Sequence, residues 1–162
     1  WINFRMRGML VSFAAYDLWL HWRRPGLHLA GLFLDYEPGI HWSQMQMQSG
    51  TTGVNALRIY SPTKQALDQD PEGVFIRGWI PELAGLARGH LAEPWKMGPL
   101  EQRAAGFRIG RDYPAPIVDH AAAVRLAKGR FAAVRGRPDA RSEAARVYLR
   151  HGSRRGPRAR PR

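Results

Sequence analysis

The chain has 162 residues, 44% of them apolar and six of them tryptophan, which is enough for a folded domain with one core. It contains no cysteine, which excludes disulfides, thiolate metal sites and cysteine nucleophiles. No apolar run approaches the ~20 residues of a membrane-spanning helix, so no membrane association is expected. Trp1 already stands within an established pattern, and we therefore expect a fragment of a longer protein.

The net charge of +12 is concentrated in the C-terminal part of the chain. Residues 125–162 hold thirteen Lys and Arg against two acidic residues, whereas residues 1–124 hold twelve against eleven. The first interpretation of residues 136–162 is a basic, disordered and solvated tail. The alternative is a segment that binds polyanions with an affinity that falls as salt rises.

The first two predicted elements are helices. Apolar residues recur at steps of three and four over residues 2–22, which predicts a helix with one buried stripe. Pro25 ends this helix and favours the start of a second one over residues 27–34, which has Asp35 at its C-terminal end. The helix dipole disfavours a carboxylate at that end, so Asp35 is expected to have a partner or a ligand.

The next segments are punctuated by proline and glycine. Pro38 and Gly39 are interpreted as a break, followed by a loop over residues 40–53 with room for a short helix. Residues 58–65 are predicted to be extended and then to turn at the Ser-Pro pair in their middle.

Three further helices are expected downstream. The stretch "VFIRGWIPEL" predicts a helix that Pro81 ends or kinks. Asp119 is a candidate N-cap for a helix to about Arg135, and a weak helix is expected around residues 140–150. No alternating run is long enough for a strand. The predicted fold is all-α, an irregular multi-helical bundle with long structured loops.

Arg7, Asp35 and Glu37 are the first candidates for chemistry. If the first two helices pack antiparallel, Arg7 can pair with Asp35, either as a structural ion pair or as part of a pocket in which Glu37 points at a ligand. His41, in the expected loop, is most simply a surface or hydrogen-bonding residue. The six histidines show no metal-ligand spacing, so no metal site is predicted.

A longer series of short motifs resembles a known family. The series "WINFRMR…LDYE…QSGTTG…RIYSPTKQ…FIR.WIPEL…EPWK…YP.PIVDH" is similar in order and spacing to the photolyase/cryptochrome family. The match is to the C-terminal half of the helical FAD-binding domain and covers residues 1–135. Residues 136–162 are not covered, and the family's N-terminal α/β domain and the first half of its FAD domain have no counterpart in the chain.

The resemblance implies an FAD site around the candidates named above. Asp35 matches the family aspartate that pairs with an arginine, here Arg7, beside the flavin ring. Glu37 matches a second acidic position, and His41 the position that faces flavin N5, commonly asparagine in repair enzymes. The implied cofactor-binding residues are Phe4, Arg7, Asp35, Tyr36, Glu37 and His41.

The family's chain of tryptophans is altered here. Trp22 matches its middle member, whereas the flavin-proximal position is Met45, which is harder to oxidise. Trp42 is a candidate substitute. Together with the proton-bearing His41, Trp22 and Trp42 are the implied catalytic residues.

The resemblance also implies contacts with DNA, from which the family flips a lesion into a cavity over the flavin. Phe4 stands where repair enzymes commonly have asparagine, and Gly8 where they often have methionine. Arg58 is expected to contact a phosphate. The implied DNA-binding residues are Phe4, Arg5, Arg58 and Gln65.

The implied function is FAD-dependent, blue-light-driven repair of pyrimidine dimers by a DNA photolyase, a carbon–carbon lyase. Damaged DNA is the expected partner, and the full-length protein is expected to be monomeric and cytoplasmic. Two alternatives stay open: a cryptochrome-like blue-light photoreceptor without repair, and a truncated inactive remnant. The departures at Phe4, Gly8, His41 and Met45 favour the photoreceptor modestly.

Overall fold

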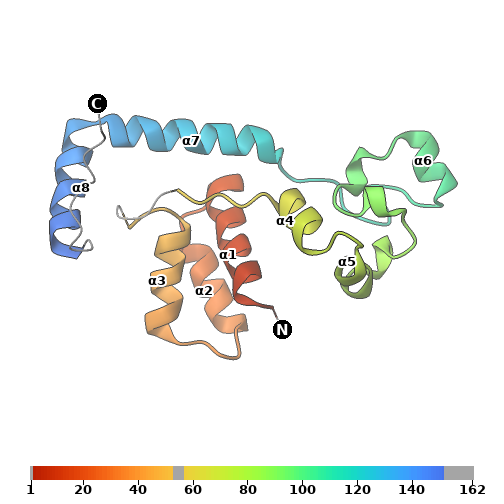
Figure 1. The fold of residues 1–162 in the computed structure, drawn as a ribbon, viewed down its shortest axis with the longest axis horizontal. Helices are drawn as coiled ribbons and strands as arrows, with labels where there is room; N and C mark the ends of the chain where they lie inside the picture. The colour runs from red at the N-terminus through yellow and green to blue at the C-terminus, as the bar shows by residue number, and fades with distance from the viewer. Residues whose placement is uncertain (1, 53–56, 152–162) are drawn as a thin grey trace. The chain divides into compact units, whose positions relative to one another are not determined.

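The computed structural model describes residues 2–52 and 57–151, which form helices joined by turns and irregular segments (Figure 1). These two stretches contain no strand, apart from an isolated bridge. The prediction of an all-α fold is therefore confirmed. The chain divides into two compact units, the first formed by Trp1–Ile59 with Ala121–Arg162 and the second by Tyr60–His120.

The first helix, α1 (Phe4–Ser12), is shorter than the helix predicted over residues 2–22. Asn3 caps its start, because its side-chain oxygen accepts a hydrogen bond from a backbone N–H of the first turn. The chain then widens into a π-helical turn, η1 (Phe13–Asp17). Trp19, just beyond, adopts a left-handed φ of 53°. These features end the helix, and apolar spacing signals neither of them.

The next two helices differ from the prediction at their boundaries. α2 (Arg23–Leu32) begins earlier than expected, because Pro25 fits a first turn, where no backbone N–H bond is needed. α3 (Pro38–Gln48) covers most of the segment interpreted as a loop, so that interpretation was wrong. Pro38 takes the first helical position and Glu37 caps the end, so the Pro-Gly pair starts a helix here.

Two helices follow in the C-terminal part of the first unit. α7 (His120–Gly136) and α8 (Pro138–His151) agree with the helices expected to about residue 135 and around residues 140–150. The segment interpreted as a basic tail, residues 136–162, is therefore helical over the residues of α8. Residues 152–162 lie outside the described residues.

Tyr16 is central to the packing of α7 in this unit. It is 1% exposed, and its ring lies 5.8 Å from that of Phe131 between centroids. The cluster consists of buried Ala15, Tyr16 and Ala127, with Leu57, Ile59 and Phe131 packed against it. Since α7 buries little other apolar surface, these contacts provide much of the free energy that packs α7 against the rest of the first unit.

Burial also raises the pKa of the Tyr16 phenol to about 12, and the nearby charge of Arg135 opposes that rise. Because the unfolded phenol has a pKa near ~10, this contribution to stability is complete below about pH 10 and is lost as pH rises toward about 12. Two pKa units correspond to about 3 kcal/mol. We expect the free energy of unfolding of the parent chain to fall over this pH range. The fall should be smaller in Tyr16→Phe, because phenylalanine has no phenol to ionise. Urea melts at about pH 9 and 11.5 test this, and equal losses in both proteins would contradict it.

The second unit is built from short helices: α4 (Pro62–Gln69), α5 (Val74–Trp79), η2 (Pro81–Leu83), η3 (Arg88–His90), η4 (Pro94–Lys96) and α6 (Pro99–Ala104). Residues 58–61 are irregular, and α4 begins at Pro62, where the sequence predicted a turn. α5 ends just before Pro81, as predicted. Asp70 holds the start of α5, because its carboxylate accepts hydrogen bonds from the N–H groups of Phe75 and Ile76 at 3.1 and 2.8 Å.

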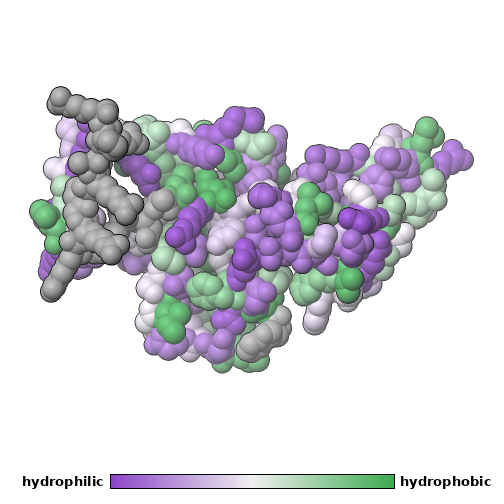
Figure 2. Space-filling model, viewed as in Figure 1, coloured by the Kyte–Doolittle hydropathy of each residue, from purple (hydrophilic) through white to green (hydrophobic). Residues whose placement is uncertain are grey.

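The core of this unit is a separate apolar cluster of Leu83, Leu86, Leu91, Met97 and Phe107. On the face shown in Figure 2, hydrophobic side chains also reach the surface, interspersed with hydrophilic ones. Within the described residues, no helix has the length and apolar character needed to cross a membrane. The same residues contain no group of three acidic, His or Cys side chains that could hold a metal ion.

Candidate functional site

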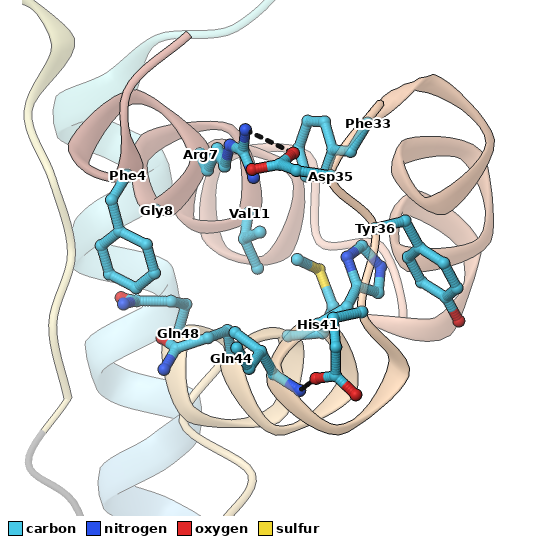
Figure 3. A pocket seen from close by; sticks show the side chains of 13 residues that line it. Phe4, Arg7, Gly8, Val11, Phe33, Asp35, Tyr36, His41, Gln44 and Gln48 are labelled. Carbon is cyan, nitrogen blue, oxygen red and sulfur yellow. Dashed lines mark hydrogen bonds and ion pairs between the residues drawn. The ribbon is translucent and has the colours of Figure 1, made fainter.

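The first unit contains a cavity of about 340 Å³, walled by α1, the segment after α2, and α3 (Figure 3). Its lining includes all six residues predicted to bind a cofactor: Phe4, Arg7, Asp35, Tyr36, Glu37 and His41. Gly8, another position singled out in the sequence, also lines it. The structure thus brings these side chains from three separate segments to one place.

Arg7 and Asp35 form an ion pair at this cavity, with Nη2 donating to Oδ1 at 2.9 Å. The guanidinium also lies over the ring of Phe33, 4.3 Å from its centroid. The hydrogen bond from Arg7 holds the pKa of the Asp35 carboxyl below its usual range, so the pair stays charged at neutral pH. Asp35 does not end α2 but follows it after a turn, and its partner on α1 explains a carboxylate there.

Glu37 has a structural role that the sequence did not indicate. Its two carboxylate oxygens accept hydrogen bonds from the N–H groups of Gly39 and Ile40 at 3.1 and 2.6 Å. A negative charge at a helix N-terminus is favoured by the helix dipole. Glu37 therefore fixes the start of α3 while its side chain lines the cavity.

His41 is buried, at 5% exposed, rather than lying in a surface loop. Its Nε2 lies 2.9 Å from the carbonyl oxygen of Gly26. A carbonyl can only accept, so Nε2 carries the proton and a neutral ring presents Nδ1 as an acceptor. Gly26 is itself close-packed, because a Cβ there would lie 2.8 Å from the ring of Trp42. This close approach holds α2 against α3.

The tryptophans predicted as catalytic are neighbours of this wall. The rings of Trp42 and His41 lie 5.0 Å apart, and those of Trp42 and Trp22 lie 6.1 Å apart, both edge to face. Trp42 also donates a hydrogen bond from Nε1 to the hydroxyl of Tyr36 at 3.1 Å. Met45 lines the cavity and is buried, whereas Trp42 packs behind the lining residues.

The lining residues missed in the sequence include two polar ones. Gln44 and Gln48 lie on α3 and face the cavity, and the side-chain oxygen of each is buried without a described hydrogen-bond partner. With His41 they follow the spacing of one helix face. That signal was present, but it could be used only if residues 38–48 were taken as a helix.

Residues 1–133 match the family model described as the FAD binding domain of DNA photolyase. The chain belongs to this family. The resemblance to the photolyase/cryptochrome family is confirmed, and so is FAD as the cofactor that the family binds.

Curated relatives and solved structures agree with this assignment. The chain is 36% identical over 116 residues to a cryptochrome DASH of Gloeobacter violaceus, with 71% of this chain and 23% of that protein covered. It is 36% identical over 122 residues to a deoxyribodipyrimidine photo-lyase of Alkalihalophilus pseudofirmus, with 74% and 26% covered. A Synechocystis cryptochrome structure matches with a TM-score of 0.76 at 27% identity, over 80% of this chain and 27% of that one. The chain thus spans about a quarter of the length of these photolyase-family relatives.

The cavity fits part of an FAD molecule. Its volume is at the lower end of the range for ligand pockets, about 300–1,000 Å³, which suits a ring system better than a whole dinucleotide. Apolar side chains such as Val11 and Met45 offer contact to ring faces. Arg7 Nε and the oxygens of Gln44 and Gln48 are buried polar atoms without described partners, which a ring with polar edges can satisfy.

The residues predicted to face DNA are not all in one unit. Phe4 lines the cavity and is 58% exposed, and Arg5 and Arg58 are exposed in the first unit. Gln65 lies on α4, in the second unit. Their role in DNA binding stays a prediction.

Proposed function

We propose that this chain forms one wall of the flavin and DNA site of a deoxyribodipyrimidine photolyase-like protein. That protein would repair pyrimidine dimers by FAD-dependent, blue-light-driven chemistry. The observation that carries the proposal is the cavity with the Arg7–Asp35 pair at its edge, in the segment that matches the photolyase FAD-binding domain. The deoxyribodipyrimidine photo-lyase names of relatives support repair, and the cryptochrome names keep the photoreceptor as the alternative.

The residues of the chain have distinct roles in this proposal. Bound FAD supplies absorption of blue light and one-electron chemistry. Arg7, fixed by Asp35 and by the Phe33 ring, orients the flavin and offers it positive charge. His41 presents an acceptor nitrogen, or a proton when charged, at the wall of the cavity. Tyr36 contributes a ring beside His41.

The tryptophan pair and the exposed basic residues also have roles in the proposed function. Trp42 and Trp22 are proposed as oxidisable rings in contact with one another. Trp42 would take the role of the flavin-proximal tryptophan, because that position is Met45 in this chain. Arg5 and Arg58 would contact DNA phosphates, which position a duplex without reading its sequence. Phe4, exposed at the cavity, would pack against a flipped base.

The test has two steps, both on the 162-residue chain. FAD is added, the excess is removed, and an absorption spectrum is recorded; we expect a retained flavin band. The flavin is then reduced, and oligonucleotides with a cyclobutane or a (6-4) lesion are illuminated with blue light or kept dark. Light-dependent loss of one lesion supports repair, retained flavin without loss supports the photoreceptor, and loss of the flavin band contradicts the cofactor site in this chain.

A further inference from the structure

Gln44 and Gln48 of α3 place polar atoms without described hydrogen-bond partners in the cavity wall. Gln48 is 4% exposed, and its side-chain oxygen is buried without a described partner. Gln44, one helical turn earlier, has a side-chain oxygen in the same situation. Both side chains lie along α3 at the cavity in Figure 3, with Gln48 next to Phe4.

Leaving such groups unpaired is costly. A buried polar atom without a hydrogen bond destabilises a protein by about 1–3 kcal/mol. Here two amide oxygens on one helix face share a cavity with the unpartnered Nε of Arg7. Structures keep such groups mainly where a ligand or ordered water meets them.

The chemistry of these groups specifies what they would receive. A carboxamide carries an acceptor and a donor side by side, and this holds whichever way the amide is assigned. The matching ligand edge is a carbonyl next to an N–H, and Arg7 Nε offers a donor for a second carbonyl. An edge of the type C(=O)–N–H–C(=O) on a flat ring matches one carboxamide and a donor such as Arg7 Nε, and Val11 and Met45 offer the apolar contact that such a ring needs.

We propose that Gln48, assisted by Gln44, binds the imide N–H of a pyrimidine-2,4-dione ring, with the side-chain oxygen of Gln48 as acceptor. Two molecules carry this edge: the flavin ring and a thymine of a damaged DNA strand. The inference rests on the proposed function for the identity of these molecules and adds the residues that read their edge.

The experiment compares riboflavin with 3-methylriboflavin, in which a methyl group replaces the imide hydrogen. Dissociation constants are measured by quenching of flavin fluorescence for the 162-residue chain, for Gln48→Leu and for Gln46→Leu. Gln46 is an exposed glutamine of the same helix that does not line the cavity, so its variant is the matched control. Thermal melts by circular dichroism check that each variant is folded.

The expected result is a difference that depends on Gln48. Methylation should weaken binding about tenfold or more in the parent chain and in Gln46→Leu, and less than about twofold in Gln48→Leu. If Gln48→Leu does not fold, Gln48→Glu serves instead. It keeps an acceptor and loses the donor, and it should retain the preference for the unmethylated ring.

The outcomes separate the inference from the proposed function. If riboflavin binds and methylation costs the same with and without Gln48, the inference is overturned, the polar groups are met by water, and the flavin site stands. If a thymine dinucleotide photodimer shows the Gln48-dependent effect of N3-methylation and riboflavin does not, the inference holds with a DNA base as the source. If neither probe binds, the inference and the cofactor site proposed for this chain both fail.

Discussion

Replacing Asp35 with asparagine is expected to weaken binding of FAD by about tenfold. The substitution removes the charge that holds the Arg7 guanidinium at 2.9 Å and fixes its orientation at the cavity. Arg7 would keep its contact with the Phe33 ring and an uncharged acceptor at residue 35, but its hydrogen bond there would lose the strengthening effect of the carboxylate charge. The measurement is a fluorescence titration of FAD with the parent chain and with Asp35→Asn at neutral pH and constant salt.

The matched control is Asp139→Asn on α8. Asp139 forms a similar exposed pair with Arg137 at 2.6 Å, and neither residue lines the cavity. Loss of a carboxylate changes the net charge equally in both variants, so a general electrostatic effect on the phosphates of FAD would appear in both. Equal dissociation constants for Asp35→Asn and the parent chain would rule out this role for the ion pair.

Tyr16→Ala should have the largest effect on stability, a loss of about 3–5 kcal/mol from the free energy of unfolding of the first unit. The side chain is 1% exposed and packs against Phe131 and Ala127, so its removal leaves a cavity between η1 and α7. A urea melt followed by far-ultraviolet circular dichroism measures the loss.

Tyr16→Phe is the control for this substitution. It keeps the ring and removes only the hydroxyl, which is buried without a described hydrogen-bond partner. We expect its free energy of unfolding at neutral pH to lie within about 1 kcal/mol of the parent value. If alanine were tolerated as well as phenylalanine, the cluster around Tyr16 would not be what attaches α7.

How far the fold could be predicted is illustrated by α3. The Pro-Gly pair at residues 38 and 39 is a frequent break, and the polar run after it has no clear apolar stripe. What decides the outcome is the carboxylate of Glu37, which satisfies two N–H groups of the first turn. The same residue was interpreted as a ligand contact, and that interpretation hid its value as a helix start signal. α7 was easier, since a long run of Ala, Val and Leu after a polar residue is typical of a helix.

The residues that line the cavity were predicted better than its local structure. Helix packing and the family resemblance both singled out Arg7 and Asp35, and the resemblance singled out His41 although it was expected in a loop; the structure brings all three to one cavity, and their role in FAD binding stays a prediction. Gln44 belongs to no motif that was recognised, and Gln48 opens the recognised motif QSGTTG, to which no role was assigned. Their burial depends on the helical register of α3, and that register became visible only in the structure.

The π-helical turn η1 makes the first unit sensitive to chain length at one point. A π turn closes a longer hydrogen-bonded ring than an α turn and accommodates one more residue. Removing one residue from Phe13–Asp17 would let the segment return to α geometry while the residues on either side keep their directions, because the wider turn absorbs the extra residue. Ala15 and Tyr16 lie inside the turn, so a deletion there would remove or redirect a side chain that packs against α7, while α1 would still line the cavity. A single-residue gap in this turn would therefore mark relatives that attach their last helix in a different way.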